Sequence, residues 1–301
     1  MTINVDKLRQ AVQGEFLLNE PMAKHTSFQI GGPADVLILP SGEKDVAAVQ
    51  AFARSEGIRL TVLGNGTNVL VRDKGIRGIV LKLGNSLQDF QQEEENLLFG
   101  SGYSLIKAAK RAGELGLTGM EFAAGIPGSM GGAVYMNAGA YDGEMSKIVA
   151  KVWVMDTCGQ VQVLNRDQME FGYRHTVLQN SGKVVLRVQL ELARGEQEAI
   201  LAKMDDFNQR RASKQPLEMP SAGSTFKRPP GLFAGTLIDQ CGLKGYTVGG
   251  AQVSLKHAGF VVNNGQATAE DVLQVIAGVQ ARVLALKGVH LYPEVLILGE
   301  E

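Results

Sequence analysis

The chain has 301 residues, 45% of them hydrophobic, enough to build two or three modules with cores of their own. Thirty basic residues balance thirty-one acidic ones, which argues against a broad basic face for nucleic acid or an anionic membrane. No stretch reaches the roughly 18 apolar residues of a membrane helix, and charges interrupt the N-terminal segment where a signal peptide needs an apolar core. We expect a cytoplasmic protein without membrane insertion.

The cysteines and histidines predict neither a disulfide nor a metal site. Cys158 and Cys241 lie far apart in the sequence, which fits a reducing compartment, and we expect both thiols to be buried. The four histidines are scattered and form no zinc-binding spacing. No metal is expected.

The first third of the chain predicts strands around one helix. Apolar runs predict strands at residues 34–39, 60–63, 69–71 and 78–81. Residues 45–53 are rich in alanine and have the apolar spacing of a helix. The polar segment Gly-Asn-Gly-Thr-Asn at residues 64–68 separates two of these strands.

The middle third mixes helix and strand. Residues 104–115 predict a helix with Ser104 as its N-cap. Residues 149–155 and 161–164 flank a turn like a hairpin, and residues 183–192 alternate as a further strand. We expect an α+β fold.

Two helices and a terminal strand are predicted in the last third. Residues 196–213 form a charged helix with apolar residues at helical spacing, and a capping box of Thr268 and Asp271 opens a second helix. Apolar residues 295–298 predict a strand at the end of the chain.

Residues 125–143 are the most informative stretch, with six glycines in nineteen residues. Bare backbone amides in such a segment can approach a large ligand closely, and its apolar residues would anchor it to a core. A glycine-rich packing turn is the alternative. The segment at 64–68 offers amides and hydroxyls suited to phosphate oxygens, although an ordinary hairpin turn explains it equally well. Together the two loops point towards an extended cofactor.

Three further segments have polar residues with two possible roles. Lys214, Lys227 and Arg228 could hold substrate phosphates near Ser224, or they could belong to a solvated basic loop. The arginine in residues 171–175 is either catalytic or stacked on its aromatic neighbour at the surface. Glu294 precedes the terminal strand, where it is either an exposed edge residue or a carboxyl held in a cleft.

Together these motifs resemble the UDP-N-acetylenolpyruvoylglucosamine reductases of peptidoglycan synthesis, the MurB family. The resemblance runs from His-Thr-Ser-Phe-Gln-Ile-Gly-Gly at residues 25–32 to Pro293-Glu294, and includes Gly172-Tyr173-Arg174 and Ala-Gly-Ser-Thr-Phe-Lys at residues 222–227. Residues 229–235 lead almost directly into a helix without an additional tyrosine-bearing loop, as in the shorter, type II members. Substrate-lid residues of the longer type therefore cannot be carried over.

The resemblance implies a two-part FAD-binding region of the vanillyl-alcohol-oxidase and p-cresol-methylhydroxylase type, followed by a C-terminal α+β substrate-binding domain. The expected boundaries are 1–82 and 83–205 for the two FAD-binding parts and 206–301 for the substrate-binding domain. FAD is expected to bind noncovalently. The implied cofactor contacts are Ile30, Gly31, Gly64, Asn65, Gly66, Thr67, Asn68, Gly125, Ile126, Pro127, Gly128, Gly131, Gly132, Asn137, Gly139 and Ala140.

The implied reaction uses NADPH as co-substrate. Its hydride passes through the flavin N5 to the enolpyruvyl group of UDP-N-acetylglucosamine enolpyruvate, which gives UDP-N-acetylmuramate. The resemblance assigns Arg174 and a protonated Glu294 to the developing oxyanion, Ser224 to proton donation, and Tyr173, Lys214 and Lys227 to substrate binding. An oxygen-using flavin oxidase and a non-catalytic sugar-nucleotide- or flavin-binding protein are the alternative functions.

Overall fold

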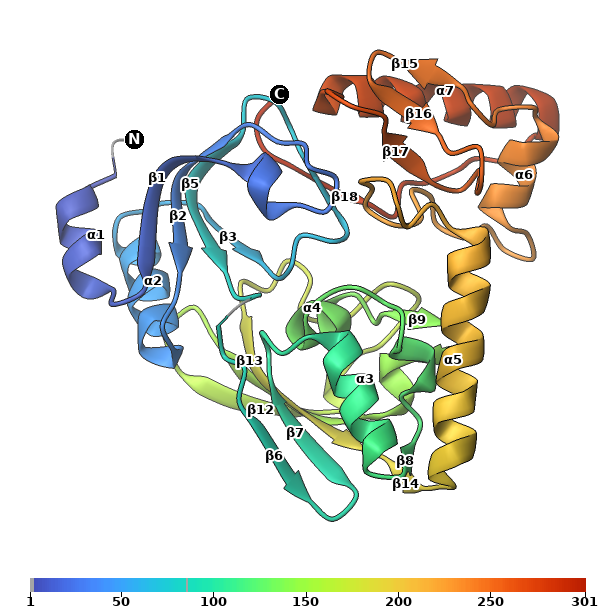
Figure 1. Ribbon diagram of the computed structural model, residues 1–301. Coiled ribbons are helices and arrows are strands. Elements are labelled where there is room, and N and C mark those ends of the chain that lie inside the picture. Colours follow the sequence, from blue (N-terminus) through green and yellow to red (C-terminus); the bar gives the residue numbers. More distant parts are fainter. Residues whose placement is uncertain (1–2, 85) are drawn as a thin grey trace. The chain divides into compact units, whose positions relative to one another are not determined.

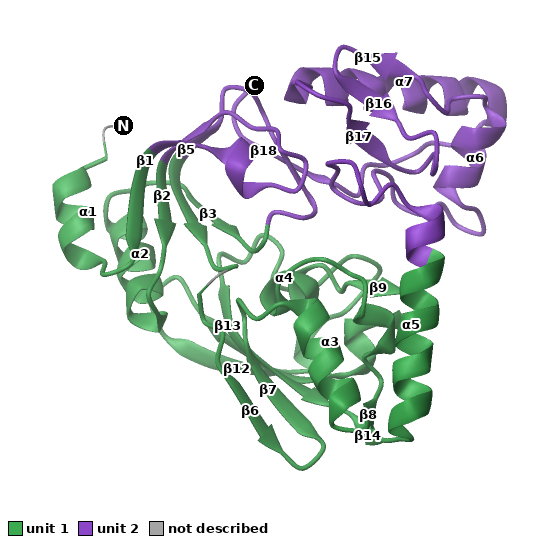
Figure 2. Ribbon diagram, in the orientation of Figure 1, with its two compact units in different colours: residues 1–18, 36–65, 78–210 green, residues 19–35, 66–77, 211–301 purple. Residues whose placement is uncertain are grey.

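The computed structural model describes residues 3–84 and 86–301, and the chain divides into two compact units (Figure 2). Unit 1 comprises residues up to 18, residues 36–65 and residues 78–210, and unit 2 comprises residues 19–35, 66–77 and 211–301. Each unit is therefore built from separate stretches of the chain. Across the described ranges, no helix combines the length and apolarity needed to cross a membrane.

The helices and strands are labelled in Figure 1. The helices are α1 (Val5–Ala11), α2 (Glu43–Ser55), α3 (Leu105–Glu114), α4 (Met130–Tyr135), α5 (Gln197–Lys214), α6 (Ala234–Gln240) and α7 (Ala269–Lys287), with the 3-10 helices η1 (Met22–His25), η2 (Glu121–Ala123), η3 (Met145–Lys147) and η4 (Asp167–Met169). The strands are β1 (Glu15–Pro21), β2 (Pro33–Leu39), β3 (Leu60–Leu63), β4 (Val69–Val71), β5 (Ile76–Lys82), β6 (Phe90–Glu93), β7 (Asn96–Gly100), β8 (Leu117–Thr118), β9 (Gly139–Ala140), β10 (Gly143–Glu144), β11 (Val149–Met155), β12 (Val161–Asn165), β13 (Val184–Glu191), β14 (Ala193–Arg194), β15 (Thr247–Val248), β16 (Ala251–Val253), β17 (Val261–Asn263) and β18 (Leu296–Leu298).

An antiparallel five-stranded sheet in the order β12-β11-β13-β7-β6 forms the centre of unit 1. Helices α3 and α4 pack against each other, and α4 also contacts β7 and β13. Helix α3 buries its apolar stripe, including Leu105 and Ala108, while its lysines face solvent. The helices and the sheet thus share one core that also includes Phe99 and Val188.

A second core in unit 1 lies under α2. It contains buried residues of β2, α2, β5 and β13, among them Val46, Ile79 and Leu186. The sheet here has the order β1-β2-β5-β3, and β3 and β5 are parallel, with Leu63 opposite Lys82. This pairing brings β3 to the start of the first glycine-rich loop.

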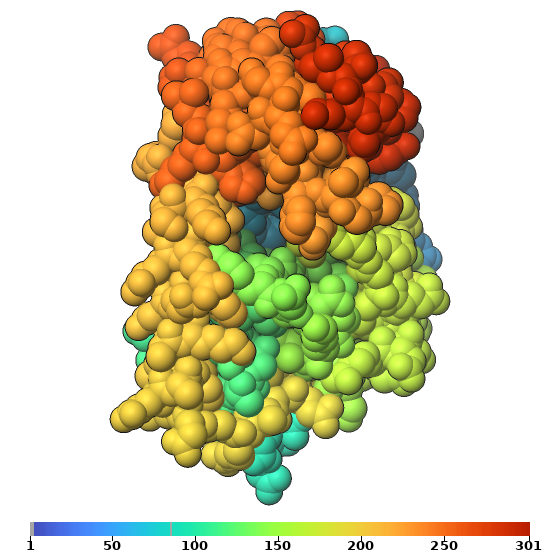
Figure 3. Space-filling view, turned by 90° about the vertical axis from the view of Figure 1, so that its right-hand side faces the viewer, coloured from blue at the N-terminus to red at the C-terminus, as the bar shows by residue number. Residues whose placement is uncertain are grey.

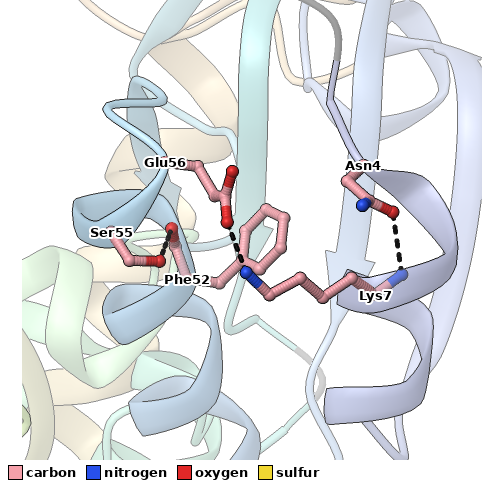
Figure 4. Close-up of polar contacts among 5 residues, drawn as sticks. All are labelled: Asn4, Lys7, Phe52, Ser55 and Glu56. Carbon is pink, nitrogen blue, oxygen red and sulfur yellow. Dashed lines mark hydrogen bonds and ion pairs between the residues drawn. The ribbon is translucent and has the colours of Figure 1, made fainter.

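Helix α1 packs beside α2 through a small set of polar and aromatic contacts (Figure 4). The Asn4 side chain caps α1 by accepting the Lys7 backbone N–H at 3.1 Å. The Lys7 ammonium pairs with Glu56 and lies 5.7 Å from the centroid of the Phe52 ring. Because these groups are exposed or near the surface, the Lys7–Glu56 ion pair contributes little to the free energy of unfolding, although it links α1 to α2.

Unit 2 has a core of its own, in which α7 packs against the antiparallel sheet β15-β16-β17 (Figure 1). The apolar face of α7 includes Val272, Val279 and Val283, each fully buried. Phe28 and Leu70, from the first quarter of the chain, belong to the same core. The parallel pair β18 and β4 also joins the last residues of the chain to residues 69–71.

Most of the expected elements are confirmed. Ser104 caps α3, and Thr268 and Asp271 form the capping box of α7. The hairpin is β11 and β12, and the charged helix is α5. The prediction that residues 125–143 form one loop is wrong, because the middle of this stretch is the short helix α4. Ser129 is its N-cap and accepts the Gly132 N–H at 3.3 Å. The expectation of two buried thiols is also wrong, because Cys158 lies exposed beside Arg54, whose guanidinium donates to its sulfur.

Helix α5 borders the end of the second glycine-rich stretch. Tyr141 stacks on Phe207 of α5 with ring centroids 4.2 Å apart and 9° between the planes, and the Tyr141 hydroxyl donates to the Phe207 carbonyl at 3.0 Å. In the space-filling view the yellow α5 forms a ridge beside green residues of this segment (Figure 3). The stack fixes residues 139–143 against the helix.

Candidate active site

Unit 1 brings the start of the first glycine-rich loop next to the second. A Cβ added at Gly64 would lie 2.5 Å from the Ser129 hydroxyl oxygen, so a side chain here would displace that hydroxyl. Gly128 adopts φ +145°, and a Cβ at Gly131 would lie 2.9 Å from that of Ser101. The two loops that the sequence suggested as one cofactor site therefore converge here.

Several backbone N–H groups of these loops have no protein acceptor. Among the hydrogen bonds of the described residues, none uses the N–H of Asn65, Gly128 or Ser129. Amide donors left in this state require a ligand or water. Such donors from two neighbouring loops, beside glycines that leave space, suit the phosphate and carbonyl oxygens of a dinucleotide cofactor. The residues of this part of the site fit FAD.

The end of the second loop joins the arginine segment. The buried Asn137 has φ +43°, and its side chain donates to the Gly172 carbonyl at 2.9 Å and accepts the Ser146 N–H at 2.9 Å. The Arg174 guanidinium donates to the carbonyls of Asn137 at 3.2 Å and Gly139 at 3.0 Å. The arginine and the predicted cofactor loop are thus parts of one network.

Tyr173 remains at the surface of unit 1. Its side chain is 49% exposed, and its ring centroid lies 5.0 Å from the Arg174 guanidinium carbon. Arg174 therefore stacks on its aromatic neighbour, as one of the two sequence-based alternatives expected, and it also donates hydrogen bonds to the proposed cofactor loop. The cation–π contact and the two carbonyl bonds together restrict the guanidinium.

The rest of the first loop belongs to unit 2. Gly66 has φ +68°, and a Cβ there would lie 2.2 Å from the His25 carbonyl oxygen. The Ser27 N–H donates to the Gly66 carbonyl at 3.0 Å. Gly31 has φ +142° and lies against Val71, while Ile30 is only 3% exposed. The Ile30 side chain is thus a core residue, and its contact with a ligand would be through its backbone.

Unit 2 also joins the serine and glutamate motifs. The Glu294 N–H donates to the Thr225 carbonyl at 2.8 Å, and Phe226 pairs with Pro293 in an isolated bridge. Thr225 is held in turn, because its N–H donates to the Gly259 carbonyl at 2.8 Å and its hydroxyl accepts the Val261 N–H at 2.9 Å. A rigid pair of backbone segments therefore presents Ser224 and Glu294 together.

The first loop contacts this pair as well. The Asn68 side chain donates to the Glu294 carbonyl at 3.3 Å, and the Asn68 carbonyl accepts the Leu296 N–H at 3.0 Å. Ser224 itself is exposed, and Gly223 before it adopts φ +74°. Asn68 is therefore a scaffold residue for the terminal glutamate in addition to a candidate cofactor contact.

Two lysines of the proposed substrate site are exposed in unit 2, and one of them, Lys214, acts on the partly buried His257. Lys214 and Lys227 are both exposed, and the guanidinium of Arg228 lies 3.9 Å from the centroid of the Phe233 ring. Burial lowers the pKa of His257, and the charges of Lys244 and Lys214 lower it further. His257 is therefore neutral near pH 7, and its Nδ1 accepts the Gly259 N–H at 3.1 Å.

Sequence analysis missed two residues that organise this site, Ser129 and Gln179. Ser129 could have been found as an N-cap, because serine is a common residue at the start of a helix. The signal was weak, because Gly132 stands where a capping box has an acidic residue or glutamine. Gln179 could not have been found, since its hydrogen bonds reach the Tyr135 carbonyl, 44 positions away. Long-range side-chain bonds of this kind leave no local pattern.

Comparison with known proteins agrees with this geometry. Residues 34–165 match the FAD binding domain family, and residues 215–298 match the C-terminal domain of UDP-N-acetylenolpyruvoylglucosamine reductase. The UDP-N-acetylenolpyruvoylglucosamine reductase of Caldanaerobacter subterraneus subsp. tengcongensis is 50% identical over 300 residues, 99% of each chain. That of Clostridioides difficile is 45% identical over 299 residues, covering 99% of this chain and 98% of the relative.

A solved structure shows the same relationship. The MurB enzyme of Thermus caldophilus superposes with a TM-score of 0.81 at 36% identity, covering 95% of this chain and 99% of the other. Sequence and structure agree over nearly the whole length, and the chain belongs to the UDP-N-acetylenolpyruvoylglucosamine reductase (MurB) family.

Proposed function

We propose that this chain is an FAD-dependent oxidoreductase that reduces UDP-N-acetylglucosamine enolpyruvate to UDP-N-acetylmuramate with NADPH as the reductant. Its membership of the family and its FAD binding domain support this reaction. The observation that carries the proposal is the 2.8 Å bond from the Glu294 N–H to the Thr225 carbonyl. This bond holds the backbone of Glu294, the candidate carboxyl, against the residue that follows Ser224, the candidate proton donor.

Bound FAD supplies a centre that accepts a hydride from NADPH and returns it to the substrate. The chain would hold the cofactor chiefly through backbone groups of residues 64–68 and 125–140, where glycines leave room and, among the described residues, the N–H groups of Asn65, Gly128 and Ser129 have no protein acceptor. The Asn137 side chain is already committed to two protein bonds. Its contribution to cofactor binding is therefore made by the backbone.

Arg174 and Glu294 act on the charge that develops beside the substrate carboxylate. The Arg174 guanidinium is planar and always charged, so it can direct a fixed pair of N–H groups at an oxyanion. Glu294 in its protonated form adds a further donor. Hydrogen-bond donors that are already in position before the reaction stabilise the developing charge most effectively. The backbone hydrogen bonds around Arg174 and Glu294 hold these two residues in position.

Ser224 donates the proton that completes the reduction. A hydroxyl is a weak acid in water, but a carbanionic carbon is a strong enough base to take its proton. Lys227 lies three residues from Ser224 and stabilises the alkoxide that remains. Lys214 and Tyr173, both exposed, complete the proposed substrate contacts.

An anaerobic absorbance experiment tests the proposal. NADPH is added to the purified holoprotein to bleach its flavin, and UDP-N-acetylglucosamine enolpyruvate is then added. Prompt return of the oxidised spectrum supports both half-reactions. Bleaching followed by recovery only after oxygen is admitted would instead support an oxidase, and a protein without flavin would contradict the cofactor assignment.

A further inference from the structure

The arginine segment of unit 1 is a tight turn with an unfavourable backbone conformation at its corner. The Gly172 N–H donates to the His175 carbonyl at 3.0 Å, and the His175 N–H returns a bond to Gly172 at 3.2 Å. Between them, Arg174 adopts φ +53°, the left-handed region. For a residue with a side chain this conformation needs support from its surroundings.

Gln179 supplies that support. Its Nε2 donates to the Arg174 carbonyl at 3.0 Å and to the Tyr135 carbonyl at 3.3 Å, and the Met136 sulfur is a further, weaker acceptor at 3.9 Å. Its Oε1 lies 3.2 Å from His175 Nδ1. These contacts fix the orientation of the amide, because a flipped group would place its oxygen against two carbonyls.

The same contacts join the arginine turn to α4. Tyr135 is the last residue of that helix, and its carbonyl accepts a second bond from the Thr176 hydroxyl at 3.0 Å. Asn137, two residues later, binds the Gly172 carbonyl and receives the Arg174 guanidinium on its own carbonyl. Gln179 thus closes a ring of hydrogen bonds around Arg174, and all of its members belong to unit 1.

We infer that Gln179 is a positioning residue that holds Arg174 in its reactive orientation. The inference rests on the proposed function, since it assumes that Arg174 acts on the substrate. Without the amide, the carbonyl of Arg174 loses the donor that Gln179 supplies, and its backbone can leave the left-handed region. The guanidinium would then move relative to its target, and displacements near 1 Å can slow a reaction about a hundredfold.

Gln179→Met tests the inference in the holoenzyme, because methionine keeps the length of the side chain without its donors. We expect the same flavin content, reduction by NADPH within about twofold of wild type, and reoxidation by UDP-N-acetylglucosamine enolpyruvate slowed at least about tenfold. The loss should be in the limiting rate rather than in the half-saturating substrate concentration. Gln179→Glu, which turns an oxygen towards two carbonyls, should be at least as slow.

Gln50→Met is the matched control. Gln50 is a buried glutamine of unit 1 whose Nε2 donates to the Gly182 carbonyl at 3.2 Å, so its loss also removes a bond to a backbone carbonyl. Reoxidation of this variant should stay within about twofold of wild type. Equal slowing in both variants, or normal reoxidation of Gln179→Met, overturns the inference.

Hydrogen exchange supplies a readout that does not depend on the substrate. The amides of Gly172 and His175 should exchange at least about tenfold faster in Gln179→Met than in Gln50→Met. Unchanged exchange overturns the inference even if the wild-type protein fails to accept the substrate. Failure of the wild-type protein with increased exchange in the variant would instead contradict the proposed function alone.

Discussion

At the scale of single residues, Ser224 differs from its neighbour Thr225 in how many hydrogen bonds it makes within the described part of the chain. Its neighbour Thr225 makes three hydrogen bonds to the protein, whereas Ser224 is exposed and follows Gly223 at φ +74°. A hydroxyl that is presented in this way is available to a ligand. The contrast gives Thr225 a structural role and leaves the Ser224 hydroxyl accessible for the proposed proton donation.

Ser224→Ala should therefore slow only the step that needs a proton. We expect reduction by NADPH at the wild-type rate and reoxidation by the enolpyruvyl substrate slowed by about 10² to 10⁴, the usual contribution of a general acid. Stopped-flow absorbance of the flavin measures both steps. Ser55→Ala, which removes a hydroxyl bonded to the Phe52 carbonyl of α2, serves as the control. A loss shared equally by both half-reactions would exclude Ser224 as the donor.

Asp45 makes a residue-scale prediction about stability. Burial of its carboxyl raises the pKa, but hydrogen bonds from Gln13, Gly14 and Ser41 outweigh burial, and the pKa of Asp45 is lowered. Because the folded-state pKa lies below that of the unfolded chain, this stabilisation is complete above about pH 4 and is lost as the pH falls through the folded-state pKa.

Asp45→Asn should cost about 1–3 kcal/mol at pH 7, since it leaves buried donors without their charged acceptor. The difference from wild type should narrow as the pH is lowered below about 4. Urea unfolding between pH 7 and pH 3 measures this difference in the free energy of unfolding. Asp6→Asn, at an exposed position, is the control. A difference that stays constant over this range would show that the carboxylate charge is not the source.

Residue identities of this kind were only partly predictable. Glycines and charged motifs stand out in a sequence, and the family resemblance assigned roles to Ser224, Arg174 and Glu294. Whether those three residues perform these roles stays a prediction. The supporting amides of Asn137 and Gln179 could not be predicted, because their partners lie 35 and 44 positions away.

At the scale of elements, α4 links the cofactor loop to the arginine turn. It has six residues and contains Gly131 and Gly132, so intrinsic propensity alone would not form it. Ser129 caps its start, and bonds from Thr176 and Gln179 satisfy the Tyr135 carbonyl at its end. This explains why periodicity identified α3, α5 and α7 but not α4: tertiary contacts supply the stability that its length and composition lack.

Ser129→Ala should consequently affect stability and cofactor binding together. Loss of an N-cap costs about 1 kcal/mol, and a frayed α4 would disorder the N–H groups proposed to bind FAD. We expect a several-fold weaker affinity of the apoprotein for FAD, measured by flavin fluorescence. Thr268→Ala, which removes the cap of α7 in unit 2, should cost similar stability without weakening FAD. Equal FAD affinity in both variants would contradict the role of α4.

At the scale of the whole molecule, the folding units do not follow simple stretches of sequence. The core around α7 includes Phe28, Ile30 and Leu70, and β18 pairs with β4. The Asp73 carboxylate also accepts the N–H groups of Ala269 and Glu270 at 2.8 and 3.0 Å. Sequence analysis could not reveal these contacts, because nothing local in residues 19–77 marks them as partners of the last ninety residues.

The three-part division at residues 82 and 205 stays a proposal, and the folding of an isolated C-terminal fragment would test its last part. A fragment of residues 206–301 lacks the early core residues, the Asp73 contact to the start of α7 and the strand opposite β18. We expect it to show weak near-ultraviolet circular dichroism and no cooperative urea transition, because its apolar surface remains incompletely covered. Adding a second fragment of residues 1–205 should restore a cooperative transition by supplying the missing partners. Cooperative unfolding of residues 206–301 alone would instead show that α7 and its sheet form a sufficient core, and that residues 19–77 join a module that is already folded.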